Sequence, residues 1–167
     1  MKKIIFVVML ALVPAFGFAQ KFGHVNKSDI IPMMSEYKSA QTELEELKKQ
    51  YSEELDYMES EYRKKVEDYE KNRETLPDNI RARREQEIVE SQQKMQQYFD
   101  DCQTNISQRY NELLNTINTK ANKAIQAVGE EGGYVCIFDI SDGLVPFVSS
   151  TLTTDVTEAV KSKLGIK

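Results

Sequence analysis

Apolar residues in the middle of this 167-residue chain recur with a period of eleven, in two stretches separated by one short break. In the first stretch these positions are Leu44, Leu47, Tyr51, Leu55, Met58, Tyr62, Val66 and Tyr69. In the second they are Ile88, Ser91, Met95, Phe99, Cys102, Ile106, Tyr110, Leu113, Ile117, Ala121, Ala124 and Val128, where Ser91 is the one polar member. Steps of 3, 4 and 4 give about 3.67 residues per turn, close to a straight α-helix. Both stripes are narrow, so each helix needs a partner face one helix wide, and the two stretches are predicted to form an antiparallel hairpin.

The break between the two stretches is the segment Leu76-Pro77-Asp78-Asn79. Pro77 cannot continue a helix, and Asp78 suits the N-cap of the helix that follows. At the far end Gly132-Gly133 is a strong helix terminator. We therefore expect a coiled-coil arm over residues 35–131 with its tip near 75–79.

The segments on either side of the arm carry the patterns of short strands. We expect strands at Lys21–Asn26, Tyr134–Phe138 and Leu144–Ser149, the last two joined as a hairpin through the turn Ser141-Asp142-Gly143. Asp155 then opens a closing helix with Val156, Ala159, Val160 and Leu164 on one face.

Together, residues 20–34 and 132–167 predict a β body of about 50 residues, which is too small to bury a proper core alone. Because its strand edges would also be exposed, several copies joined through their strands would satisfy both needs. The fold class is thus mostly α, with a helical hairpin inserted between strands of a small, oligomeric, β-barrel-like body. The residues expected to build this oligomeric body are Phe22, Val25, Val135, Ile137, Phe138 and Leu144.

Residues 1–19 read as a secretory signal peptide. Lys2 and Lys3 precede an apolar run over residues 4–13, and Gly17-Phe18-Ala19 offers small residues for cleavage after Ala19. The mature chain is expected to be exported and, with no second apolar run, soluble.

The charge of the mature chain changes the range of partners. Residues 20–167 hold 20 Lys and Arg against 27 Asp and Glu, a net charge of −7, which argues against nucleic acid as a partner. Basic side chains gather at the arm tip: Arg63, Lys64, Lys65, Arg81, Arg83 and Arg84. Two interpretations stay open, a solvated face of mixed ion pairs or a surface that meets anionic lipid headgroups or an acidic partner.

The sequence offers no catalytic chemistry. His24 is the one histidine, and no metal-ligand spacing or nucleophile triad accompanies it, so we expect no enzyme activity, no metal site and no cofactor. Cys102 and Cys136 suggest a disulfide in an exported protein. The arm geometry opposes this, because Cys102 would lie roughly 40 Å from the body at 1.5 Å per residue. A disulfide needs Cα atoms within about 7 Å, so both thiols are predicted to be free.

Several segments resemble the Skp/OmpH family of periplasmic chaperones, and the resemblance covers nearly all of the mature chain. They are the opening strand Lys21–Asn26, the arm entry Pro32–Tyr37 with Ala40 and Leu44, the segment Glu131–Leu144, and the closing Asp155–Gly165. The resemblance implies a homotrimer in the periplasm whose β body comes from three chains and whose three arms enclose a cavity. Members hold unfolded outer-membrane proteins there without ATP.

The resemblance also has limits. Well-known members are basic, whereas this mature chain is acidic, so charge attraction to clients or lipid would be either weaker or confined to the tip. The lipopolysaccharide site of some members is not carried over, because residues 105–110 offer only Arg109.

Three apolar residues outside the predicted stripes are candidates for contact with an unfolded client: Tyr57, Val89 and Tyr98. The alternative is that they are scattered surface residues with no special role. The rival function is a structural coiled-coil spacer or tether in the cell envelope.

Overall fold

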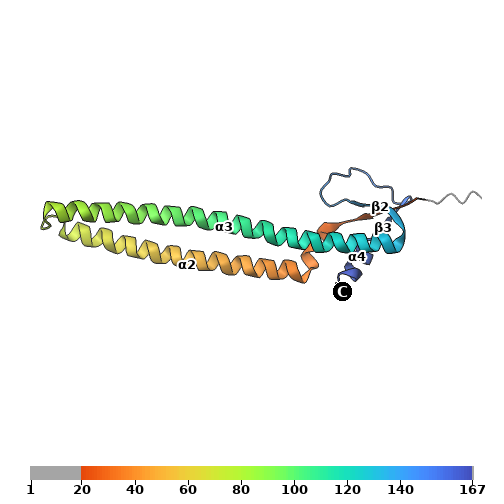
Figure 1. Cartoon of the computed structure of the whole chain (residues 1–167), viewed down its shortest axis with the longest axis horizontal. Coiled ribbons are helices and arrows are strands. Elements are labelled where there is room, and N and C mark those ends of the chain that lie inside the picture. Colours follow the sequence, from red (N-terminus) through yellow and green to blue (C-terminus); the bar gives the residue numbers. More distant parts are fainter. Residues whose placement is uncertain (1–19, 167) are drawn as a thin grey trace, which may run out of the picture.

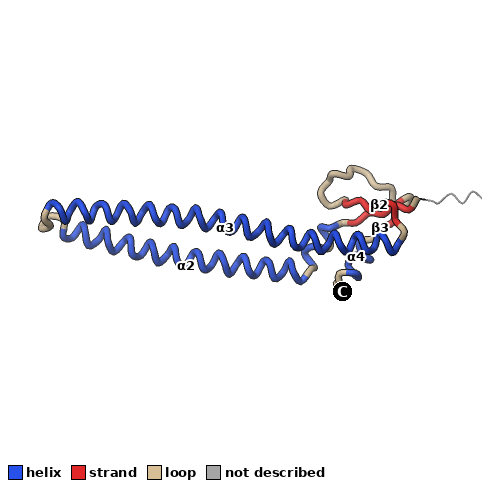
Figure 2. Tube along the Cα trace, viewed as in Figure 1, coloured by secondary structure: helices blue, strands red, loops and turns tan. Residues whose placement is uncertain are grey.

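A long helical hairpin projects from a small sheet in the computed structural model, which describes residues 20–166 (Figure 1). The expected signal peptide lies outside the described residues. The elements in chain order are β1 (Lys21–Val25), the 3-10 turns η1 (Lys27–Asp29) and η2 (Ile31–Met33), α2 (Ser35–Asn72), α3 (Asp78–Gly132), β2 (Tyr134–Asp139), β3 (Thr153–Asp155) and α4 (Thr157–Lys163). The predicted architecture of a helical hairpin with a small β body is confirmed (Figure 2).

The arm is formed by α2 and by the first two thirds of α3, which run antiparallel. The 38 residues of α2 make the arm about 57 Å long at 1.5 Å per residue. At the tip, the Arg81 side chain donates hydrogen bonds to the carbonyl oxygens of Arg73 (3.1 Å) and Leu76 (3.2 Å). The N-cap of α3 is Pro77 and not Asp78, which instead lies in the first turn, where its charge suits the helix dipole.

The seam between the two helices follows the predicted stripe on α2, where all eight of its residues are half-buried. On α3 the phase of the prediction is wrong at two places. The α3 residues that follow the seam and are buried or half-buried are Ile88, Ser91, Met95, Tyr98, Cys102, Ile106, Arg109, Leu113 and Ile117. Glu87 and Leu114 beside them are half-buried as well. Phe99 and Tyr110 are 43% and 49% exposed.

Tyr98, expected outside the seam, lies within it and packs edge-on against Tyr51, with 6.1 Å between ring centroids. Arg109 takes the equivalent place eleven residues later and reaches Glu43 on α2. The error has a simple cause. Two neighbouring stripes of α3 have the same period and offer the adjacent pairs Tyr98/Phe99 and Arg109/Tyr110. In each pair the prediction chose the more apolar residue, but the other residue faces α2.

The sheet has the order β2-β1-β3, and β1 is parallel to both neighbours. The predicted hairpin is therefore wrong, and residues 144–149 form a loop instead of a strand. Two strands that are parallel to the same neighbour need a connection that returns the chain to its starting edge, which a tight turn cannot do. Pro146 in this loop also lacks the backbone N–H that a ladder requires.

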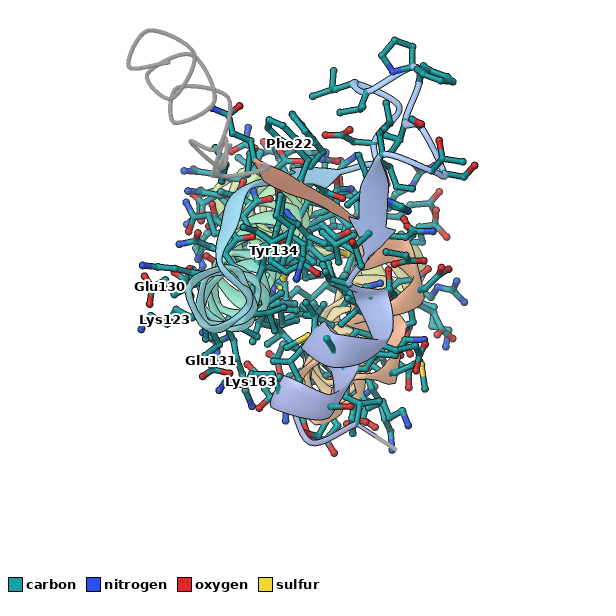
Figure 3. The ribbon with its side chains drawn as sticks, turned by 90° about the vertical axis from the view of Figure 1, so that its right-hand side faces the viewer. Phe22, Lys123, Glu130, Glu131, Tyr134 and Lys163 are labelled. Carbon is teal, nitrogen blue, oxygen red and sulfur yellow. The ribbon has the colours of Figure 1, made fainter. Side chains whose placement is uncertain are left out.

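The body core is shared by the N-terminal segment, the end of α3 and α4. Its buried residues include Val25, Ile30, Met34, Ile117, Ala121, Ala124, Val128, Val156 and Val160. Ala159, predicted on the apolar face of α4, is exposed, while Thr157 is buried in its place. Lys163 of α4 forms an ion pair with Glu131 at the end of α3 (Figure 3). The last turns of α3 thus serve the body and not the arm seam.

Gly133 ends α3 in the left-handed conformation, with φ of 65°, as the sequence predicted for a helix terminator. Gly132 is required for another reason: a Cβ there would lie 2.4 Å from the ring of Tyr134. The ammonium group of Lys21 also contacts the Tyr134 ring, with its Nζ 4.0 Å from the ring centroid.

Cys102 is buried in the arm seam and Cys136 is exposed on β2, and both thiols are free, as predicted. Within residues 20–166, no helix has both the length and the apolar character needed to cross a lipid bilayer.

Candidate functional site

The face of the sheet that carries Phe22 has apolar side chains over β1 and β2 and the polar group His24, Thr153 and Asp155 toward β3. Phe22 of β1 stacks on Phe138 of β2 with ring centroids 6.3 Å apart. Val135, near the start of β2, is 61% exposed. Figure 3 shows Phe22 on the side of the sheet away from α3 and α4. Phe138 is 38% exposed and Phe22 is half-buried, so part of this face is open to another molecule.

The loop over residues 140–152 extends this apolar surface. Its side chains of Leu144, Phe147 and Leu152 are 81, 80 and 79% exposed. Large apolar side chains gathered at such exposure are typical of an interaction surface, because leaving them in water is unfavourable.

Of the six residues predicted for the oligomeric body, Val25 and Ile137 pack in the chain's own core. The outward-facing ones are Phe22, Val135, Phe138 and Leu144. Phe147 was missed because the predicted strand 144–149 included it, and Leu152 was missed because it lies between that strand and the closing helix.

The loop is anchored at both ends. At its start, Lys27 forms an ion pair of 2.8 Å with Asp139, which also accepts hydrogen bonds from the backbone N–H (3.0 Å) and hydroxyl (2.6 Å) of Ser141. Partial burial works to raise the pKa of Asp139, but the hydrogen bonds from Lys27 and Ser141 outweigh it and leave the pKa below its ordinary value. At its end, the Thr153 hydroxyl donates to the carbonyl oxygen of Ser149 (2.6 Å).

His24 has structural partners. Its Nδ1 lies 3.0 Å from the Thr153 hydroxyl, and its Nε2 lies 4.0 Å from the Asp155 carboxylate, so it links β1 to β3. Hydrogen bonds from Thr157 are the main cause that lowers the pKa of Asp155, and the nearby His24 adds to it. This arrangement ties β1 to β3 at the end of the sheet, and the Thr153 hydroxyl directs its own hydrogen to the Ser149 carbonyl oxygen and not to the imidazole.

The two sides of the arm differ in chemistry. One side is polar: Arg109 donates to Glu43 (2.5 Å) across the seam and to Glu112 (2.9 Å) along α3, and its hydrogen bond lowers the pKa of Glu43. The other side has an apolar hollow near the root of the arm. Its lining includes Tyr37, Leu44, Tyr110, Leu113 and Leu114.

The basic residues of the tip are mostly engaged with neighbouring acids. Their ion pairs are Arg63–Glu59 (2.6 Å), Lys64–Glu61 (2.8 Å), Arg83–Glu87 (2.9 Å) and Arg84–Glu87 (3.1 Å). Arg81 binds backbone carbonyls, and Lys65 donates to Ser91 across the seam (2.8 Å). These contacts favour the interpretation of a solvated face with mixed pairs over that of an open anion-binding surface.

The three candidate client-contact residues do not behave alike. Tyr57 and Val89 are 61% and 51% exposed, on α2 and α3 respectively. Tyr98 is half-buried against Tyr51 and belongs to the seam. The exposed aromatic residues that sequence reasoning placed in the seam, Phe99 and Tyr110, lie on the surface instead.

The chain combines a long two-helix arm with exposed apolar residues on its sheet and loop. These are features of the class of proteins that bind other proteins. Residues 21–164 match the family described as outer membrane protein (OmpH-like), which is nearly the whole chain. The chain therefore belongs to the OmpH-like family, as the resemblance predicted. None of the curated proteins compared with the chain matches it.

Proposed function

We propose that this protein is an ATP-independent periplasmic chaperone that holds unfolded outer-membrane β-barrel proteins between the arms of a homotrimer. Membership of the OmpH-like family supports a chaperone role in the outer-membrane pathway. The observation that carries the proposal is the arm itself, which projects far from the body and keeps apolar side chains only half covered along its length.

A hairpin of two helices leaves much of its own seam open, because a third helix would be needed to close it. In the arm, each seam residue of α2 from Leu44 to Tyr69 is half-buried. A client can therefore make many weak apolar contacts at once, and their sum through multivalency holds it without any single tight site. Weak individual contacts also let the client leave without ATP.

Assembly follows from the body, to which we assign residues 20–34 and 132–167 together with the last turns of α3 that pack in its core. Its open face at Phe22 and Phe138 and its loop with Phe147 would be covered by the strands of other copies. The number of three copies comes from the family resemblance. Three arms on one such body would enclose a cavity that shields the client from other unfolded chains.

Two observations support the proposed location in the periplasm. The expected signal peptide over residues 1–19 directs export, and the family is one of envelope proteins.

The experiment that tests the function uses the purified mature protein without nucleotide. A urea-unfolded outer-membrane barrel protein is diluted into it, and light scattering follows aggregation. A urea-unfolded soluble protein, treated in the same way, serves as the comparison. We expect scattering to be suppressed at about one client per oligomer, by multivalent capture, and more strongly for the barrel protein. Absence of protection at every ratio would refute the holdase and favour an envelope tether, which a pull-down returning a single partner would identify.

A further inference from the structure

The charge of the arm is divided unequally between its two helices. Half of α2 is charged, with 19 charged residues among 38. In the middle of α3, residues 91–119, only five of 29 residues are charged, while ten are Gln or Asn. An acidic protein with this much charge on one helix thus keeps a long stretch of the other nearly neutral.

The neutral residues are not scattered evenly around α3. A second stripe repeats the seam pattern one residue further along the chain, with steps of 4, 3, 4, 4 and 3. We call it the amide–aromatic stripe, and its six residues are Gln92, Gln96, Phe99, Gln103, Ser107 and Tyr110, all exposed. Eleven residues make three turns, so Phe99 and Tyr110 face the same direction about 16 Å apart.

The stripe leads into the apolar hollow at the arm root. Tyr110 lines that hollow together with Leu114, Leu44 and Tyr37. The stripe on the opposite flank of the seam is unlike it. Its corresponding residues are Glu90, Lys94, Gln97, Asp101, Asn105 and Gln108, half of them charged. The two flanks of one helix therefore present different chemistry at equal spacing.

We infer that the amide–aromatic stripe is the surface of the arm that binds unfolded polypeptide, and that its amides hydrogen-bond the client's backbone while Phe99 and Tyr110 cover the client's apolar side chains. The inference rests on the proposed function and identifies the binding surface within it.

The chemistry of the stripe selects this occupant. A primary amide offers a donor and an acceptor without charge, as a peptide group does. Unfolded chains have unpaired backbone groups, whereas a folded partner has already satisfied most of its own. An anionic lipid or a nucleic acid would need cations, which the stripe lacks. Gln96 alone among the three glutamines of the stripe donates to a side chain within residues 20–166, namely Asp100 (3.0 Å).

The test measures the Kd of the full mature protein for a fluorescently labelled, urea-unfolded barrel protein by anisotropy. The double variant Phe99→Ser with Tyr110→Ser is expected to raise Kd about tenfold, through lost apolar contact. Gln103→Glu should raise Kd by about threefold or more, because it replaces an amide donor with a charge. Its matched control is Gln108→Glu on the polar flank of the same helix, which should leave Kd within about twofold because a flank that already carries charge tolerates one more.

The other outcomes each overturn the inference in a distinguishable way. Wild-type Kd in the double variant, or an equal effect of Gln103→Glu and Gln108→Glu, would refute the stripe and leave the holdase standing. A double variant whose sedimentation mass falls would mean that the stripe contacts another copy of the chain. If the unmodified protein does not bind the unfolded client, the proposed function and the inference fail together.

Discussion

Burial along the α3 seam changes from the middle of the arm to its root, and a pair of matched substitutions measures that change. Ile106 and Ile117 occupy the same position of the eleven-residue repeat. Ile117 is 2% exposed and belongs to the core that joins arm to body, whereas Ile106 is half-buried between two helices. Ile106→Ala and Ile117→Ala remove the same atoms from the same helix, so burial decides the difference.

The magnitudes follow from that burial. A fully buried Ile→Ala substitution costs about 3 kcal/mol, from lost transfer free energy plus the cavity left behind. At Ile106 only part of the side chain leaves water on folding and the gap stays open to solvent, so the cost should be about 1 to 1.5 kcal/mol. We expect Ile117→Ala to lower the free energy of unfolding by about twice as much as Ile106→Ala.

Urea unfolding followed by circular dichroism at 222 nm measures both values. The protomer concentration must be equal in all samples, because an oligomer's stability depends on it. The slope of free energy against urea should stay unchanged, since neither substitution alters the surface exposed on unfolding much. An Ile106→Ala variant that loses as much as Ile117→Ala would refute the half-open seam, and with it the account of how the arm offers apolar surface.

Three further predictions concern the body. Gly132→Ala should cost about 1 to 3 kcal/mol of stability because its Cβ meets the neighbouring ring at 2.4 Å, whereas Gly129→Ala, with 3.4 Å of room, should be neutral or stabilising by thermal unfolding. Lys27→Met should cost about 1 kcal/mol in urea unfolding at pH 7, because it removes the partner of Asp139. Phe147→Asp should leave the helical content unchanged and lower the oligomer mass in sedimentation, because it places a charge in an interface.

Each of these has a contrary result. A Gly132→Ala variant that is as stable as Gly129→Ala would mean that the gain in helix propensity outweighs the ring contact at the site. The pKa of Asp139 is lowered on folding, so its ion pair contributes fully above the ordinary value of 3.8 and is lost as the pH falls through the folded value. The difference in free energy of unfolding between Lys27→Met and the unmodified protein should therefore become smaller below that pH. A difference that stays constant would contradict the ion pair. An unchanged mass for Phe147→Asp would remove the loop from the assembly surface.

The helices of this fold could be predicted because one repeat, continued over many turns, outweighs local accidents. The phase of that repeat could not be predicted, because Tyr98 and Phe99 are adjacent and both aromatic. Each of them also lies three or four residues from Met95 and from Cys102. The choice between them depends on the partner helix, where Tyr51 receives Tyr98. The same error affects the predicted client contacts, because the sequence places Tyr98 on the surface and Phe99 in the seam, whereas the structure has them the other way round.

The sheet was harder to predict for another reason. Strand pairing is a long-range property, and the parallel neighbours β1 and β2 are separated in sequence by the entire arm. A local reading therefore joined the nearest apolar runs into a hairpin through a plausible turn. The segment forms a loop that displays Phe147 and Leu152, which the proposed assembly would cover.

The eleven-residue repeat has a mechanical consequence. Helices that hold this period need little supercoiling, so the arm is a nearly straight lever fixed at one end. For a lever of about 57 Å, a rotation of only 10° at the root moves the tip by about 10 Å. The large core side chains Met34 and Ile117 lie at that root, and small shifts among them are amplified along the whole arm. In the proposed assembly, the space between the arms would therefore be set by packing near the body, far from where a bound chain would touch them.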